Sequence, residues 1–222
     1  MADRATPRVT MNALAEYLTA SAGRRRAIIT EQRSPKTFRV AYYADAEDAI
    51  VGAIAGQLSQ APLDAGRAKI LVAPVSKQWD MARRDTQLDA IEAVRTFLQS
   101  AAADSLRDLA LARRRTSPLL VGGVAVSVRP DLLVEATPGE VVGAVKLFFS
   151  KTAVLNDERS RYAGAILQMA VESLKGAQGV DHRRCLVLDV FAGRIHQAPR
   201  TSRRRRQDVE AACSEIETMW SA

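Results

Sequence analysis

An acidic residue and a lysine suited to phosphodiester chemistry lie in one central stretch of the chain, residues 124–146. Asp131 follows Pro130 at the end of an apolar run, and Lys146 lies inside a second apolar run, 141–149. A carboxylate at a strand end can hold Mg²⁺, because hard cations prefer oxygen ligands. A lysine beside it can stabilise the charge that develops on a phosphate during attack by water. The two residues therefore predict a metal-dependent site that cuts phosphodiester bonds.

Lys146 is the more informative of the two residues, because its neighbours in the sequence are almost all apolar. Burying an unpaired ammonium group is costly, so this lysine needs a partner or a function. A salt bridge between Lys146 and Asp131, with no further role, is the simplest alternative to a catalytic site.

These residues resemble the motif of the PD-(D/E)xK nuclease superfamily, in which an acid follows one strand and an acid-x-lysine sequence lies on the next. Pro130-Asp131 matches the first part, and 143–146 matches the second except that Ala144 occupies the acidic position. The resemblance covers roughly residues 45–197. It implies a restriction-endonuclease-like α/β fold and Mg²⁺ as cofactor. Side chains two positions apart on a strand share a face, so Ala144 removes a ligand that would lie beside Lys146.

The same resemblance implies further site residues on two helices. An acid on the leading helix corresponds to Glu47 or Asp48, and a glutamine on the helix after the lysine strand corresponds to Gln168. We therefore expect Asp131, Lys146, Glu47 and Gln168 to be catalytic. The family tyrosine that follows the glutamine is replaced here by Glu172.

The acid missing at position 144 has three candidate replacements. Glu158 and Glu172 belong to a helical stripe with three- and four-residue spacing that can reach the sheet edge, and Glu135 ends the run after Asp131. We expect Asp131 and Glu158 to bind the metal. The alternative is that this stripe is the solvated face of an amphipathic helix. The stripe contains Glu158, Arg161, Ala165, Gln168 and Glu172.

A net charge of +7 and a pI near 9.8 come largely from arginine, which is concentrated at 24–26, 113–115 and 203–206. Arginine matches phosphate geometry and displaces counterions from nucleic acid. These clusters indicate a nucleic-acid-binding surface, with DNA as the expected partner. The alternative is solvated arginine at helix ends. The expected nucleic-acid-binding residues are Arg24, Arg25, Arg113, Arg114, Arg161, Arg203 and Arg204.

The elements that must position these residues form an α/β fold, a mixed central sheet flanked by helices. Thr10 is expected to cap the first helix, and Asn156 or Asp157 the helix at 158–175. We expect a strand run at 119–128 with a bulge or a tight backbone approach at Gly122-Gly123, a second run to 135, a strand at 141–149 covered on both faces and a hairpin at 184–197. A loop is expected at 60–67, an apolar strand or helix start at 69–75, and an extended piece at 37–42. Helices are expected at 11–21, 25–32, 45–59, 158–175 and 207–220, with a helical insertion at about 76–112.

Bulk properties favour one domain, 1–222, in the cytoplasm. The chain has no apolar run long enough to span a bilayer, no secretory h-region, and only two cysteines and two histidines. Membrane binding and a zinc site are therefore not expected, and both cysteines are expected to be thiols. The predicted function is a nuclease in DNA processing or defence. The alternative is a catalytically inactive nuclease-fold protein that binds nucleic acid or a partner protein; a homodimer through 76–112 is a further option.

Overall fold

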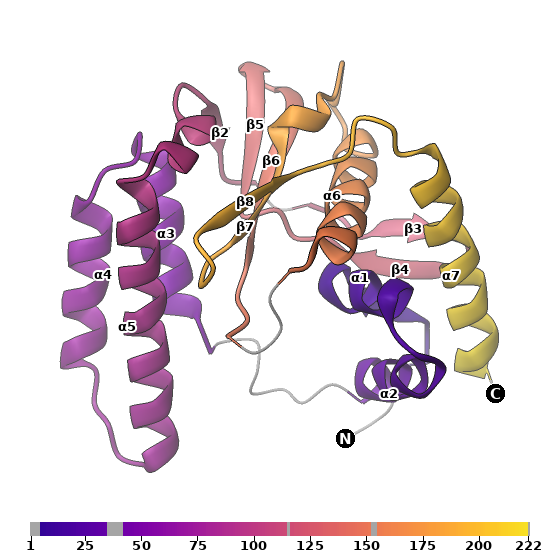
Figure 1. Ribbon diagram of the computed structural model, residues 1–222, viewed down its shortest axis with the longest axis horizontal. Coiled ribbons are helices and arrows are strands. Elements are labelled where there is room, and N and C mark those ends of the chain that lie inside the picture. The colour runs from indigo at the N-terminus through magenta and orange to yellow at the C-terminus, as the bar shows by residue number, and fades with distance from the viewer. Residues whose placement is uncertain (1–4, 35–41, 115, 152–154, 222) are drawn as a thin grey trace.

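A computed structural model describes residues 5–34, 42–114, 116–151 and 155–221 (Figure 1). The fold is mixed α/β, with two mixed sheets flanked by helices, as the sequence predicted in outline. The larger sheet has the spatial order β2 (Ala110–Ala112), β5 (Leu132–Thr137), β6 (Glu140–Phe148), β7 (Cys185–Asp189) and β8 (Arg194–Gln197). In it, β6 and β7 are parallel and the other neighbours are antiparallel.

Helices cover both faces of the larger sheet (Figure 1). One face carries α3 (Ala44–Ala55), α4 (Ala61–Val72) and α5 (Gln78–Leu98). The other carries α6 (Asp157–Glu172), on which α1 (Met11–Thr19) and α7 (Arg203–Ser221) pack, and α2 (Ala22–Arg33) packs against α1 and α7. Short 3₁₀ turns occupy Ala101–Leu106 and His182–Arg184. The strands of the larger sheet therefore position any functional residues that lie at their ends.

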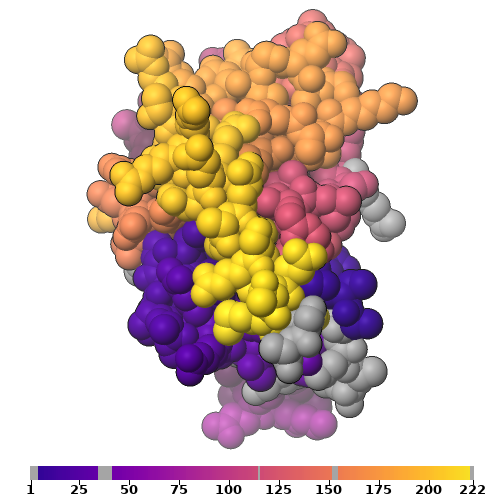
Figure 2. All heavy atoms as spheres, turned by 90° about the vertical axis from the view of Figure 1, so that its right-hand side faces the viewer, coloured from indigo at the N-terminus to yellow at the C-terminus, as the bar shows by residue number. Residues whose placement is uncertain are grey.

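The smaller sheet joins the start of the chain to its middle. It has the order β1 (Arg8–Thr10), β4 (Val124–Ser127) and β3 (Leu119–Val121), with β1 parallel to β4. Figure 2 shows α7 across the middle of one side of the molecule, and it packs on α6, β3 and β4. The pairing places β1 beside the segment that leads to Asp131.

Several local predictions are confirmed by the contacts that produce them. The Thr10 Oγ1 accepts from Ala13 N at 3.2 Å and starts α1, and Asn156 Oδ1 accepts from Arg159 N at 2.8 Å and starts α6. The strand β6 is buried on both faces, as its continuous apolar character predicted. Cys185 and Cys213 are free and buried.

The prediction for 60–112 was wrong in three places. The expected loop at 60–67 is the start of α4, because Pro62 lies in the first helical turn, where its missing N–H costs nothing. The apolar run 69–75 mainly completes that helix and is not a strand. The helical insertion ends at Leu98 and is followed by a 3₁₀ turn and then β2, which pairs with β5.

Gly122-Gly123 forms a hairpin turn and not a bulge, whereas the expected close approach to the backbone is present, because the Glu217 carboxylate packs against Gly123. Both glycines have positive φ, 48° and 73°, which a two-residue turn of this kind requires and other residues adopt only with strain. The run 119–128 is therefore two strands of the smaller sheet, and β1 was not predicted at all. The expected extended piece at 37–42 falls almost entirely outside the described residues. Within the described part of the chain, no helix is both long and apolar enough to cross a membrane.

Candidate active site

Asp131 and Lys146 meet at the point where β5 begins beside β6. The Asp131 backbone N–H donates to Val145 O at 2.9 Å, which sets the two residues opposite each other. Lys146 Nζ donates to Asp131 Oδ2 at 2.7 Å, and Leu147 N donates to the same oxygen at 2.6 Å. The Asp131 side chain is 5% exposed and that of Lys146 is 17% exposed. The two predicted residues therefore form a largely buried ion pair.

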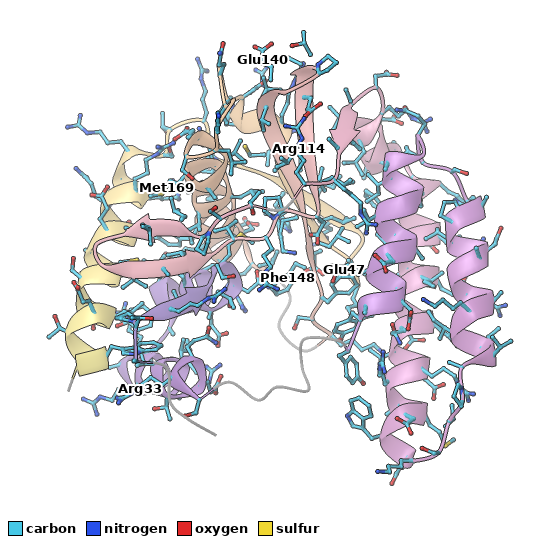
Figure 3. The ribbon with its side chains drawn as sticks, turned by 180° about the vertical axis from the view of Figure 1, so that it is seen from behind. Arg33, Glu47, Arg114, Glu140, Phe148 and Met169 are labelled. Carbon is cyan, nitrogen blue, oxygen red and sulfur yellow. The ribbon has the colours of Figure 1, made fainter. Side chains whose placement is uncertain are left out.

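Glu47 joins this pair from the opposite layer of the fold. It lies in the first turn of α3 and points toward the sheet (Figure 3), where it lines the same hollow as Asp131. Burial and the nearby charge of Asp131 raise the pKa of Glu47, and the ammonium of Lys146 opposes this rise. Two carboxyl groups therefore lie close to one lysine. We call Glu47, Asp131 and Lys146 the carboxylate–lysine cluster.

The start of α3, and with it Glu47, is fixed from another helix. Tyr43 precedes α3 and supplies no side-chain cap. Instead Gln87 of α5, only 3% exposed, accepts from Asp45 N and Ala46 N at 3.1 and 3.2 Å. These are helix N–H groups that lack an intrahelical acceptor. The amide of Gln87 therefore locks the turn from which Glu47 projects, a contact between distant segments that no local pattern in the sequence indicates.

Three adjoining hollows surround the carboxylate–lysine cluster and are rich in arginine. One of about 280 Å³ is lined by Glu47, Asp131, Pro130, Arg113, Arg114 and Arg129, among others. A second of about 480 Å³ shares Arg114, Arg129 and Pro130 with it. A third of about 280 Å³ is lined by Lys146 and Arg129. Arg129 lines all three hollows, which together border the carboxylate–lysine cluster, and we refer to them as the groove. Sequence reasoning missed Arg129, although it directly precedes Pro130-Asp131.

Other predicted site residues lie apart from this cluster. Ala144 is fully buried within the apolar core between β6 and α6. Gln168 Nε2 donates to Glu172 Oε1 at 3.0 Å, and Glu172 in turn binds Arg206 of α7 through both carboxylate oxygens, at 2.6 and 2.7 Å. Glu158 is exposed near Tyr162, whose hydroxyl group donates to Asp208 of α7. The predicted catalytic role of Gln168 and metal-binding role of Glu158 therefore have no support from proximity to Asp131, because the α6 stripe turns toward α7.

Glu135 and Asp48 bind arginines at the edge of the groove. Arg114 forms an ion pair with Glu135, and Arg113 Nη2 lies 2.7 Å from Asp48 Oδ1. The predicted arginines at 113 and 114 thus line the same hollow as Glu47 and Asp131, and each is paired with an acid that the sequence analysis named as a candidate for the site.

The remaining arginine clusters do not converge on this groove. Arg24 is neutralised by Glu16 and Glu31, both at 2.7 Å, and Arg25 contacts Tyr17 and Glu215. Arg203 and Arg204 are exposed in the first turn of α7, roughly 18 Å along the helix from Glu215 at ~1.5 Å per residue. Arg161 is exposed on α6. The three arginine clusters therefore do not converge on one face of the described structure, and for 24–25 and 203–204 this favours the alternative of arginine at helix ends.

The carboxylate–lysine cluster offers only two carboxyl groups, so a divalent cation there would need water or a substrate phosphate as further ligands. Within the described ranges, no three His, Cys, Asp or Glu side chains are grouped to bind a metal. Mg²⁺ is nevertheless commonly held by one or two carboxylates together with water and substrate phosphate. Asp131 Oδ2 is occupied by Lys146 and Leu147, so Oδ1 and the Glu47 carboxylate are the oxygens that fit this arrangement.

Comparison of the chain with protein-family models, with curated proteins and with solved structures found no match.

Proposed function

We propose that the protein is a divergent PD-(D/E)xK nuclease that hydrolyses phosphodiester bonds in nucleic acid, most simply DNA, with Mg²⁺ or a similar cation. The observation that supports this is that Glu47 lines the same hollow as Asp131, which pairs with Lys146. Glu47 thus supplies a second carboxyl group from α3, whereas the family motif takes it from position 144 on the lysine strand. The order α3, β5, β6, α6, β7 also agrees with the restriction-endonuclease-like arrangement that the resemblance implies.

Each residue of the carboxylate–lysine cluster has a definite task in this proposal. Glu47 and Asp131 would hold the cation, which when bound polarises a phosphoryl oxygen and lowers the pKa of water. Lys146 keeps a positive charge within 2.7 Å of Asp131 Oδ2, where it would meet the equatorial oxygens of the bound phosphate. Arg113, Arg114 and Arg129 would hold neighbouring phosphates along the groove.

The proposal is tested by cleavage of labelled DNA and RNA with Mg²⁺, Mn²⁺ or EDTA. We expect cleavage that requires the cation and falls by about 10²–10³-fold in Lys146→Ala. Lys175→Ala, which removes an exposed lysine just beyond α6, is the matched control and should cleave normally. Absence of cation-dependent cleavage, or cleavage that survives Lys146→Ala, would contradict the proposal.

A second candidate function is nucleic-acid binding without cleavage. It is favoured by the two bonds that Asp131 Oδ2 accepts, because they give this acid a structural task at the start of β5. This candidate expects salt-sensitive binding of DNA or RNA that survives Asp131→Ala, since phosphate contacts release counterions. Binding that is undetectable even at low salt would exclude it.

A further inference from the structure

The third hollow of the groove, on the α1 side of Lys146, differs from the other two in its lining. Its polar lining residues come from β1, α1, β4 and β6, and we call it the end pocket. They are Arg8, Thr10, Asn12, Ser127, Arg129 and Lys146. At about 280 Å³ it is close to the smallest pockets that hold small ligands. It is therefore large enough for a phosphate group with part of a nucleotide.

The end pocket has an excess of positive charge that the described residues do not neutralise. None of its lining residues is acidic. Lys146 is balanced by Asp131, but within the described residues neither Arg8 nor Arg129 lies in an ion pair with a carboxylate. Two arginines without a carboxylate partner among the described residues thus line a single hollow. An anion with two negative charges would balance them.

The neutral groups in the end pocket also suit a phosphate. The hydroxyl groups of Thr10 and Ser127 can donate to phosphate oxygens, since Thr10 Oγ1 uses only a lone pair to accept from Ala13 N. Asn12 also lines the pocket, and its Nδ2 amide can donate to a phosphate oxygen, whereas its buried Oδ1, which has no hydrogen-bond partner among the described residues, is an acceptor. The pocket therefore has polar capacity that the protein itself leaves unused.

We infer that the end pocket binds the terminal phosphate of a nucleic-acid strand, so that the protein acts on phosphorylated strand ends. A terminal phosphate carries about −1.5 to −2 charge at neutral pH, whereas an internal phosphodiester carries a single charge. The terminal group is the better match for two unpaired arginines. Lys146 lines the pocket and also pairs with Asp131, so a strand held by its end would present its next linkages to the carboxylate–lysine cluster. This inference rests on the proposed function for the identity of the strand.

The test measures binding of fluorescent oligonucleotides of one sequence that carry a 5′-phosphate, a 3′-phosphate or neither, in EDTA so that nothing is cleaved. We expect one phosphorylated form to bind about tenfold more tightly than the unphosphorylated form. Arg8→Ala should reduce this ratio to near one, and Arg8→Lys should restore part of it. Arg26→Ala, which removes an exposed arginine of α2 and changes the net charge equally, should leave the ratio unchanged.

Equal affinity for all three oligonucleotides would overturn the inference, as would a phosphate preference that Arg8→Ala leaves intact in a folded protein. Thermal unfolding of each variant checks the fold. The cleavage assay separates this result from the proposed function. Cleavage with no end preference would contradict only the proposed role of the end pocket. An end preference with no cleavage would contradict only the catalytic proposal.

Discussion

Two ion pairs of this protein involve residues that the sequence singled out, and they differ in almost every physical respect. The Asp131–Lys146 pair lies where β5 begins beside β6, and its side chains are 5% and 17% exposed. The carboxyl group of Glu47 lies near this pair. Glu172–Arg206 joins α6 to α7 at the surface, with side chains 33% and 30% exposed and both carboxylate oxygens bound. In the first pair, two carboxyl groups lie near one lysine. In the second pair, one carboxylate is fully paired with one guanidinium group.

This difference indicates which of the two ion pairs is the better candidate for a functional site. A surface pair with good geometry contributes little to stability and needs nothing more. A buried pair with an additional carboxyl group concentrates negative charge that a cation would relieve, and perturbed groups of this kind gather at functional sites. The groove lined by Arg129 borders the first pair and not the second.

The largest expected effect separates the two pairs by stability. Lys146→Met should lower the free energy of unfolding by about 3–5 kcal/mol, because it leaves buried Asp131 without its cation. Arg206→Met should cost less than about 1 kcal/mol, since Glu172 can be solvated. Urea unfolding at pH 7 measures both. Equal losses of unfolding free energy would contradict the distinction between a buried pair and a solvated one.

The sequence could predict Asp131 and Lys146 because a lysine in an apolar strand is unusual whatever surrounds it. Glu47 was suggested only through the family resemblance, and its position near Asp131 depends on how α3 packs across the sheet. The α6 stripe shows the limit of such reasoning. Helical spacing correctly grouped Gln168 with Glu172, but spacing contains no information on whether that face meets the sheet edge or α7.

Fold prediction failed for the same reason in other places. Strand β2 is short, and its identity comes from pairing with β5, which is a tertiary contact. Likewise β1 is defined only by its register with β4. Long buried strands and capped helices were predictable because their signals are local, as at Thr10 and Asn156.

The next expected effect concerns the acid missing from β6. The family motif suggests that Ala144→Asp would complete a metal site, but Ala144 is fully buried among apolar side chains. We expect Ala144→Asp to destabilise the fold by on the order of 3 kcal/mol or more, because its carboxylate would be buried. Ala144→Asn has nearly the same shape and no charge, and should cost less at pH 7. A stable Asp variant with tighter Mg²⁺ binding would show that position 144 belongs to the site.

A smaller effect tests Glu47 as the acid that replaces position 144. Glu47→Gln should lower cation-dependent cleavage by on the order of 100-fold, because one of two carboxylates is lost. Glu172→Gln is the control from the other cluster and should cleave normally. If both variants cleave alike, Glu47 has no part in the reaction.

Glu47 also gives a pH-dependent change in stability. Burial and Asp131 raise its pKa in the folded protein above the unfolded value of about 4.3. The folded state then binds the proton more tightly, so this contribution to stability is complete below about pH 4.3 and is lost as the pH rises through the folded pKa. In EDTA, Glu47→Gln should therefore be more stable than the wild type at pH 8, with a smaller difference at pH 4. Thermal unfolding at the two pH values measures this, and a constant difference would contradict it.

The smallest expected effect is at Gln168, which the family resemblance makes catalytic and the structure places beside Glu172. Gln168→Ala should change cleavage by less than about twofold and stability by about 1 kcal/mol or less, because it removes one hydrogen bond from a half-exposed group. A loss comparable to that of Glu47→Gln would mean that α6 reaches the reacting phosphate when nucleic acid binds. The comparison of the two ion pairs would then describe only the unbound protein, because α6 would have to move with Glu172 and Arg206 attached.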